Sequence, residues 1–190
     1  MTVIGVMALQ GAFAEHQTAL ARLGVDTVQL RKAADLTQPL DGIVLPGGES
    51  TVMGKLMNDL GMMAPLQKRV RYGLPVLGTC AGLILLADKV DGGPGPWLST
   101  MPIAVRRNAY GRQLGSFSAE AAFTGRQIPM EFIRAPYIEQ VGPGTKELAT
   151  VNGHTVAAEY GNQLAVAFHP ELTDDPTVYR HFLAKVDRTV

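Results

Sequence analysis

One cysteine lies between two glycines, in the sequence Gly78-Thr79-Cys80-Ala81-Gly82. Apolar runs precede and follow this segment, so the pattern predicts a buried strand, a tight turn and a buried helix. Glycines on both sides permit a turn that places the middle side chain above the edge of a sheet. There the free N–H groups and the dipole of the following helix favour a thiolate. The spacing predicts that Cys80 is a nucleophile, although a lone cysteine can also be a small buried apolar residue.

A thiol nucleophile needs a base, and the base needs a group that orients it. His169 follows the apolar segment Leu164–Phe168 and is separated from Glu171 by a proline. Residues two apart in an extended chain point to the same side, so Glu171 could bond one ring nitrogen of His169 and leave the other facing Cys80. The alternative is that the histidine and proline merely end a strand.

The other three histidines are weaker candidates for a base. His16 and His181 lie within amphipathic helical segments, and we expect both on the surface. His154 follows a hairpin turn, and we expect it to be exposed as well.

The composition limits the possible partners and compartments. The 190 residues suffice for one α/β domain and are too few for two of ordinary size, so we expect a single domain over residues 1–190. The formal net charge is zero and basic runs are no longer than Arg106-Arg107, which makes nucleic acid and anionic membranes poor partners. A single cysteine suits a reducing compartment, and no apolar stretch has the length of a membrane span or the flanks of a signal peptide. We therefore expect a cytoplasmic protein.

Strand and helix patterns alternate in the first half of the chain. Short apolar runs predict buried strands at Thr2–Leu9, Val25–Leu30, Gly42–Leu45 and just before Cys80. The segments between them have helical spacing; one ends at Gly24, one begins at a cap on Ser50 or Thr51, and one covers Pro65–Tyr72. This rhythm predicts an α/β fold with a mostly parallel, twisted sheet and helices on both faces, in three layers.

After Ala87 the pattern changes. Asp91–Pro96 is rich in glycine and proline and predicts an exposed loop. Asn152-Gly153 separates two strand-like segments and predicts a tight hairpin, so we expect an added antiparallel region in the C-terminal half. A last helix is expected to begin near Asp174-Asp175-Pro176 and to bury Val178, Phe182, Leu183 and Val186.

Several segments, in order and from Val3 to the final helix, resemble one family. Leu45–Thr51, Gly78–Gly82 and His169–Glu171 are similar to the class I, triad-type glutamine amidotransferases. Leu9–Gly11, Arg106–Gln113 and Phe132–Pro136 narrow the resemblance to the family of glutaminase subunits of pyridoxal 5′-phosphate synthase. The resemblance implies the flavodoxin-like fold of that class.

The resemblance also implies a mechanism. Cys80 would attack the side-chain amide of L-glutamine, His169 would pass the thiol proton to the departing ammonia, and Glu171 would orient His169. Water would then hydrolyse the thioester on Cys80 to release L-glutamate. The implied oxyanion hole comprises Gly47, Gly48 and Ala81, and each such donor is typically worth about 3 kcal/mol.

Free glutamine carries a carboxylate and an ammonium, so its site needs a cation, an acceptor and backbone groups. The resemblance implies that the substrate is held by Gly48, Glu49, Ser50, Arg107, Ile133 and Arg134. Gly47–Ser50 could instead be an ordinary turn with a serine cap, and Arg106 could be a solvated charge. Arg134 lies in a mostly apolar stretch, where an unpaired arginine would be costly, so we expect it to bind a ligand or form a salt bridge.

The resemblance implies a partner that uses the ammonia. This is a barrel-shaped synthase subunit that forms a hetero-oligomer with the glutaminase and builds pyridoxal 5′-phosphate from a pentose phosphate and a triose phosphate. Gln10 is implied near the oxyanion hole and the subunit interface, although it could simply satisfy loop backbone groups. The resemblance implies no metal and no cofactor. Gly115–Ser118, where acidic residues are expected, and the loop Asp91–Pro96 depart from the pattern, and both could alter loops that meet the partner.

Other functions remain open from the residues alone. The chain could be the glutaminase of another amidotransferase, for example in histidine biosynthesis. A cysteine hydrolase or protein-repair enzyme on a similar sheet is a second alternative, but those usually place the acid before the histidine, whereas Glu171 follows His169. A catalytically silent binding module would leave Cys80 unlabelled by an electrophilic glutamine analogue.

Overall fold

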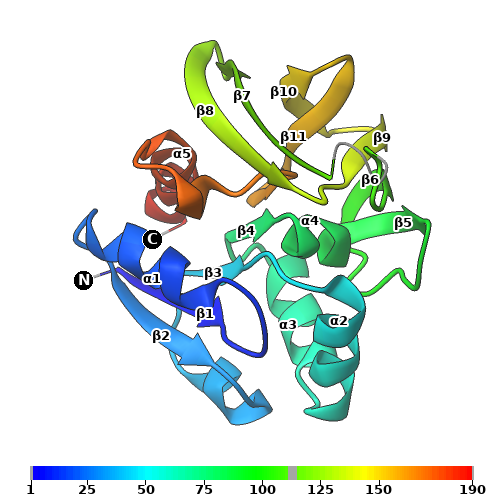
Figure 1. The fold of residues 1–190 in the computed structure, drawn as a ribbon. Helices are drawn as coiled ribbons and strands as arrows, with labels where there is room; N and C mark the ends of the chain where they lie inside the picture. The colour runs from blue at the N-terminus through cyan, green and yellow to red at the C-terminus, as the bar shows by residue number, and fades with distance from the viewer. Residues whose placement is uncertain (1, 111–114, 190) are drawn as a thin grey trace.

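The computed structural model describes residues 2–110 and 115–189 (Figure 1). The strands are β1 (Val3–Met7), β2 (Asp26–Leu30), β3 (Gly42–Leu45), β4 (Val76–Thr79), β5 (Ala87–Asp91), β6 (Met101–Arg106), β7 (Ser116–Phe123), β8 (Arg126–Ile133), β9 (Tyr137–Val141), β10 (Lys146–Val151), β11 (His154–Tyr160) and β12 (Gln163–Val166). The helices are α1 (Phe13–Ala21), α2 (Ser50–Asp59), α3 (Met63–Arg71), α4 (Ala81–Leu86) and α5 (Thr177–Asp187), with 3-10 turns η1 (Ala33–Thr37) and η2 (Pro170–Leu172). None of the helices in the described ranges is long and apolar enough to cross a membrane.

Parallel strands form the half of the main sheet that carries the predicted site. Their order is β2–β1–β3–β4–β12, and every neighbouring pair in this run is parallel. β1, β3, β4 and β12 are almost wholly buried, as their unbroken apolar sequences predict. Helices α1 and α5 lie together on one face of this sheet, and α2 and α3 lie on the other (Figure 1). The predicted mostly parallel α/β fold is therefore confirmed.

The predicted antiparallel region extends the same sheet beyond β12. β11 is antiparallel to β12, β10 and β9, and the sheet continues through β6 to β5. Asn152 and Gly153 have φ of 52° and 77° in the turn between β10 and β11, as expected of a tight hairpin. β7 and β8 form a separate hairpin that arches over this end of the molecule (Figure 1). The expectation of one domain over residues 1–190 stays a prediction.

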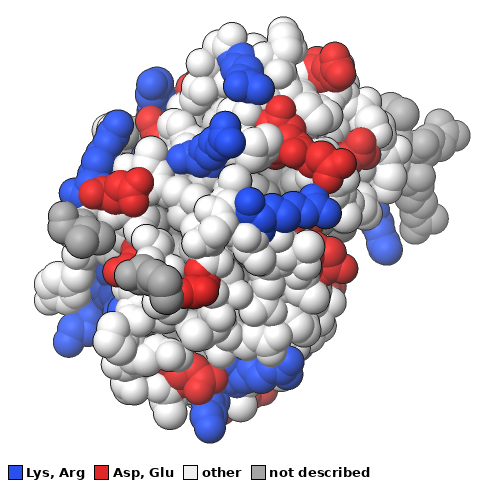
Figure 2. Space-filling model, turned by 90° about the vertical axis from the view of Figure 1, so that its left-hand side faces the viewer, with Lys and Arg blue, Asp and Glu red and all other residues white. Residues whose placement is uncertain are grey.

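Positive and negative side chains are interspersed on the surface beside the N-terminal strands and α1. Figure 2 shows lysine and arginine close to aspartate and glutamate on this face, with no large area of one sign. The arrangement agrees with the formal net charge of zero.

The start of α2 differs from its prediction. Glu49, not Ser50 or Thr51, caps α2, because its carboxylate accepts hydrogen bonds from the backbone N–H groups of Thr51 at 3.0 Å and Val52 at 2.9 Å. A negative charge there also suits the positive end of the helix. The helix after Cys80 begins already at Ala81 and ends at Leu86, because the chain turns directly into β5.

Glycines allow α4 to lie unusually close to the strands beneath it. A Cβ on Gly82 would overlap the carbonyl oxygen of Leu45, and a Cβ on Gly78 would lie 2.7 Å from the backbone of Gly82. Both obstacles are backbone atoms, which cannot rotate away. The helix that follows Cys80 therefore depends on the two glycines of the motif.

We expect Gly82→Ala to lower the free energy of unfolding by about 3 kcal/mol, since overpacking a rigid contact typically costs this much. Gly61→Ala is the matched control, because Gly61 has φ of +67° but a Cβ added there would meet nothing within 4 Å. It should cost only about 1 kcal/mol, for the backbone conformation. Urea denaturation measures both values, and equal losses would contradict the close-packing argument.

Candidate active site

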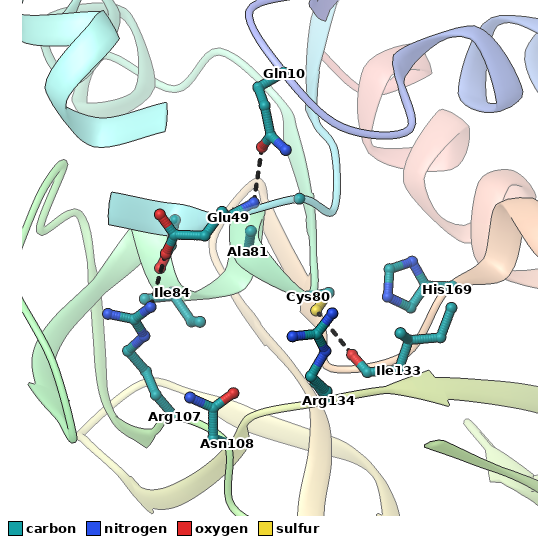
Figure 3. Close-up of a pocket in the computed structure, with 12 residues that line it drawn as sticks. Gln10, Glu49, Cys80, Ala81, Ile84, Arg107, Asn108, Ile133, Arg134 and His169 are labelled. Atoms are coloured by element: carbon teal, nitrogen blue, oxygen red, sulfur yellow. Dashed lines mark hydrogen bonds and ion pairs between the residues drawn. The ribbon is translucent and has the colours of Figure 1, made fainter. Parts of the chain in front are cut away.

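Cys80 occupies the turn between β4 and α4. Its φ of 49° and ψ of −100° are unusual for a residue with a side chain, and such strain is often found at functional sites. The backbone N–H of Cys80 donates to the carbonyl of Val166 on β12 at 2.8 Å, which fixes the turn to the neighbouring strand. The thiol lies 3.9 Å from the carbonyl oxygen of Ile133 (Figure 3). The turn therefore holds the sulfur at the carboxyl edge of the parallel strands, where such folds bind ligands.

His169 lies beside Cys80 and is held from two directions (Figure 3). Its Nδ1 is 2.7 Å from Oε1 of Glu171, and its backbone N–H donates to the carbonyl of Glu131 at 2.8 Å. A Cβ on Gly47 would lie 2.5 Å from Cε1 of His169 and 3.5 Å from Cβ of Cys80, so only glycine fits there. Nε2 of His169 makes no hydrogen bond to any described residue, which leaves it available to the thiol and to a substrate.

The charges of the site stabilise a protonated His169. Burial alone would lower the pKa of His169, but the adjacent Cys80 and Glu171 outweigh it and raise the pKa from 6.5 to about 10. Burial alone would raise the pKa of Glu171, but the hydrogen bond from His169 and the nearby imidazoles hold it below its ordinary value. The site thus favours an imidazolium on His169, between the sulfur of Cys80 and the carboxylate of Glu171. Such an arrangement can attack an electrophilic carbon through sulfur and protonate the group that leaves.

The sulfur and the imidazole open into a pocket of about 360 Å³, within the range of small-molecule sites. The residues that line it are Gln10, Gly48, Glu49, Ser50, Cys80, Ala81, Ile84, Arg107, Asn108, Ile133, Arg134 and His169. Of the site residues named from the sequence, Glu171 and Gly47 do not line the pocket, because both lie behind or against His169. Ile84 and Asn108 were not predicted. The position of Asn108 next to Arg107, in a segment already singled out, was the available signal.

Gln10 packs onto the predicted oxyanion loop. Its Oε1 accepts the backbone N–H of Glu49 at 2.7 Å, and a Cβ on Gly48 would overlap that oxygen (Figure 3). Nearby, the N–H of Ala12 donates to the carbonyl of Gly47 at 3.1 Å. One backbone donor next to the pocket is therefore occupied by the protein itself.

Arg107 crosses the pocket to reach α2. It donates to Oε1 of Glu49 at 2.8 Å and to Oγ1 of Thr51 at 3.0 Å, and its side chain is only 14% exposed. A Cβ on Gly93 would overlap the guanidinium, so the exposed loop Asp91–Pro96 packs directly against it. The close approach of Arg107 thus explains why the loop has a glycine at position 93.

The two other arginines differ in their surroundings. Arg106 forms surface ion pairs with Asp91 and Glu139, which agrees with the alternative of a solvated charge. Arg134 lines the pocket and is exposed, and the expectation that it binds a ligand or forms a salt bridge stays a prediction. The local apolar sequence did not reveal that the chain reverses there, with φ of 42°. The segment Arg106–Gln113 was also singled out from the sequence. Its residues 111–113 lie outside the described part of the chain.

His16 is the main site residue that the sequence did not reveal. It was expected on the surface but is 0% exposed, because α1 packs against η2 and α5. The signal was the spacing of His16 to Leu20, which places both on the inner side of α1. His181 and His154 are also partly buried; His181 pairs with Glu159 at 2.8 Å, and His154 stacks on Tyr137.

Comparisons with known proteins agree on one family. The model of the SNO glutamine amidotransferase family matches residues 6–188. The chain is 55% identical over 187 residues to "Pyridoxal 5'-phosphate synthase subunit PdxT" of Methanocorpusculum labreanum, covering 98% of both chains. A protein of the same name from Desulfitobacterium hafniense is 50% identical over 184 residues, covering 96% of this chain and 92% of the relative. A solved structure described as "Crystal structure of glutamine amidotransferase" has a TM-score of 0.91 and 42% identity, covering 97% of this chain and 98% of that one.

We expect Glu171→Gln to lower the pKa of His169 from about 10 by roughly one to two units, because a neutral amide no longer stabilises the imidazolium. NMR titration of the histidine ring resonances measures this. Glu159→Gln, which removes the carboxylate beside His181, is the matched control and should leave His169 unchanged. An unaltered midpoint for His169 in Glu171→Gln would contradict the electrostatic account of the pair.

Proposed function

The chain belongs to the SNO glutamine amidotransferase family, and from this we propose that it is the glutaminase subunit of a pyridoxal 5′-phosphate synthase. It hydrolyses L-glutamine to L-glutamate and ammonia and delivers the ammonia to a synthase subunit. The observation that carries this proposal is the pair of His169 and Glu171 beside Cys80, which opens into a small pocket with charged and polar groups in its lining. Relatives that share 50–55% identity over almost the whole chain support the specific synthase.

The reaction divides into two acyl transfers. Cys80 Sγ forms a bond to the amide carbon of glutamine, and the tetrahedral intermediate collapses when the imidazolium of His169 gives its proton to the departing nitrogen. Ammonia leaves, and a thioester of glutamate remains on the sulfur. His169, now neutral, removes a proton from water as the water attacks the thioester carbon. Glutamate departs, and the thiolate and imidazolium are restored. Throughout, Glu171 keeps Nδ1 of His169 protonated.

The negative oxygen of each intermediate needs N–H donors. The backbone N–H of Ala81 lies at the start of α4, next to Cys80, and the loop of Gly47 and Gly48 lies against Cys80 and His169, since a Cβ on Gly47 would be 3.5 Å from Cβ of Cys80. We assign the oxyanion hole to these groups.

The remaining lining groups match the parts of free glutamine. Arg134 stands exposed at the pocket and supplies a cation for the carboxylate, while Glu49 and Ser50 supply acceptors for the ammonium. Ser50 Oγ is buried and makes no hydrogen bond to a described residue, so it has capacity for a ligand. Ile133 and Ile84 supply the apolar wall for the two methylenes. Arg107 holds the carboxylate of Glu49 in place.

The ammonia requires a consumer, and we propose a barrel-type synthase subunit in a hetero-oligomer. Hydrolysis without that subunit would waste glutamine. Gln10, which occupies the N–H of Glu49 next to the oxyanion loop, is the residue through which docking would rearrange that loop. A cytoplasmic location, in keeping with the single cysteine, stays part of the proposal.

We expect an electrophilic glutamine analogue to add one covalent label to the wild type, at Cys80. Cys80→Ala should remain unlabelled and release no glutamate. Mass spectrometry of the intact chain and of its peptides measures the label. In the complex, ammonium salts should restore pyridoxal 5′-phosphate formation to Cys80→Ala, because only the ammonia supply is lost. Labelling of another residue, or glutamate release by Cys80→Ala, would refute the assignment.

We expect glutamate release to rise tenfold or more when the synthase subunit is added, since one missing oxyanion donor costs about 10²–10³ in kcat. An enzyme-coupled glutamate assay measures the rate with and without the partner. The synthase subunit of another amidotransferase, such as one of histidine biosynthesis, is the control and should give no rise. Equal turnover with and without the pyridoxal 5′-phosphate synthase subunit would refute the gating.

A further inference from the structure

Behind the catalytic pair lies a second, fully buried histidine. His16 on α1 is 0% exposed, and both of its ring nitrogens have partners. Nδ1 lies 2.7 Å from the hydroxyl of Tyr179 on α5. Nε2 lies 3.1 Å from Oγ1 of Thr79, the residue before Cys80, and 3.5 Å from Oε2 of Glu171. The imidazole of His16 thus contacts two parts of the site: the carboxylate of Glu171, and Thr79 at the end of the strand that precedes Cys80.

Oε2 of Glu171 depends on this contact. The side chain of Glu171 is 0% exposed, and Oε1 already accepts from His169. Within the described part of the chain, Oε2 makes no hydrogen bond, and Nε2 of His16 at 3.5 Å stands at ion-pair distance from it. A buried carboxylate oxygen without a donor is costly, so a proton on Nε2 of His16, directed toward it, has a clear physical role.

The surroundings place that proton on Nε2. Burial lowers the pKa of His16 below its usual 6.5, so the ring is neutral and has one N–H and one acceptor nitrogen. The pKa of Tyr179 is raised above its ordinary range by burial, so its hydroxyl keeps its proton and can donate to Nδ1. With the opposite tautomer, the lone pair of Nε2 would face the carboxylate. The ionisable groups around His16 are Glu171, His169, Tyr179 and, on its own helix, Glu15.

We propose that His16 is a positioning residue of the active site, whose Nε2–H holds Oε2 of Glu171 so that Oε1 stays aligned with His169. The proposal rests on the glutaminase function proposed above. Tyr179 selects the tautomer, and Thr79 shares the N–H and couples the ring to the turn at Cys80. His16 does not touch the substrate; it acts only through Glu171.

Two variants of similar length separate the donor from the packing. His16→Met retains an unbranched side chain without a donor, whereas His16→Gln places an amide N–H where Nε2 was. We expect His16→Met to lower kcat for glutamine hydrolysis in the complex about ten- to a hundredfold, as for loss of a hydrogen bond to a charged group, with KM nearly unchanged. His16→Gln should remain within about threefold of the wild type.

A double-mutant cycle tests whether His16 acts through Glu171. His16→Met should cost less than about twofold more when Glu171 is already glutamine, because interacting residues are not additive. His181→Met is the matched control, since His181 is a partly buried histidine whose carboxylate partner is Glu159, outside the site. It should leave kcat unchanged. Should His16→Met fail to fold, Tyr179→Phe, which frees the tautomer, replaces it in the same cycle.

The outcomes are distinct. Equal kcat in the Met and Gln variants, or a full additive loss in the Glu171→Gln background, would overturn the positioning role while the wild type still hydrolyses glutamine. If Tyr179→Phe takes the place of His16→Met, a kcat equal to that of the wild type overturns it as well. A wild-type complex that does not hydrolyse glutamine would instead remove the proposed function, and this inference with it.

Discussion

The parallel pairing of β4 with β12 is the constraint on which the site depends. Thr79 is in register with Val166, and the N–H of Cys80 continues this pairing at 2.8 Å from the carbonyl of Val166. Cys80 and His169 are 89 residues apart in the sequence, yet each follows its strand at the same edge of the sheet. A shift of one residue between the two strands would turn every side chain of one strand to the opposite face and separate sulfur from imidazole.

Burial determines how the charges beyond that edge are arranged. The carboxylate of Glu171 is fully enclosed, so each of its oxygens needs a donor, and the two imidazoles of His169 and His16 lie on opposite oxygens. Because the pKa of His16 is lowered by burial, that ring contributes a dipole and no full charge, and the positive charge stays on His169. The network thus directs the carboxylate toward His169 and keeps a second cation out of the buried interior.

The sequence predicted the features that depend on local pattern. Buried parallel strands have continuous apolar runs, and the turn at Cys80 needs its glycines. Both the strands and the turn could therefore be predicted from the sequence. The misses depend on what packs against a segment. The spacing of His16 to Leu20 places both on one side of α1, but it does not show that α5 and η2 cover that side. The apolar sequence Phe132–Pro136 likewise does not show that Arg134 lies at the surface. The cap of α2 was missed for a related reason: Glu49 is long enough to reach back to its own helix, and Arg107 holds it there.

The same packing explains why most polar groups of Glu49 are bonded to the protein itself. Glu49 offers its N–H to Gln10, its carboxylate to its own helix and to Arg107, and therefore has few free groups for a ligand. These bonds join the segments that follow β1, β3 and β6 around the pocket, whereas Cys80 and His169 follow the paired strands β4 and β12 of the sheet. A partner that contacts the rim can exchange the bonds of Gln10 and Glu49 without disturbing the paired strands that hold Cys80 and His169. The bonds of Gln10 and Glu49 and the pairing of β4 with β12 thus belong to different layers of the same edge, as the proposed control by a partner requires.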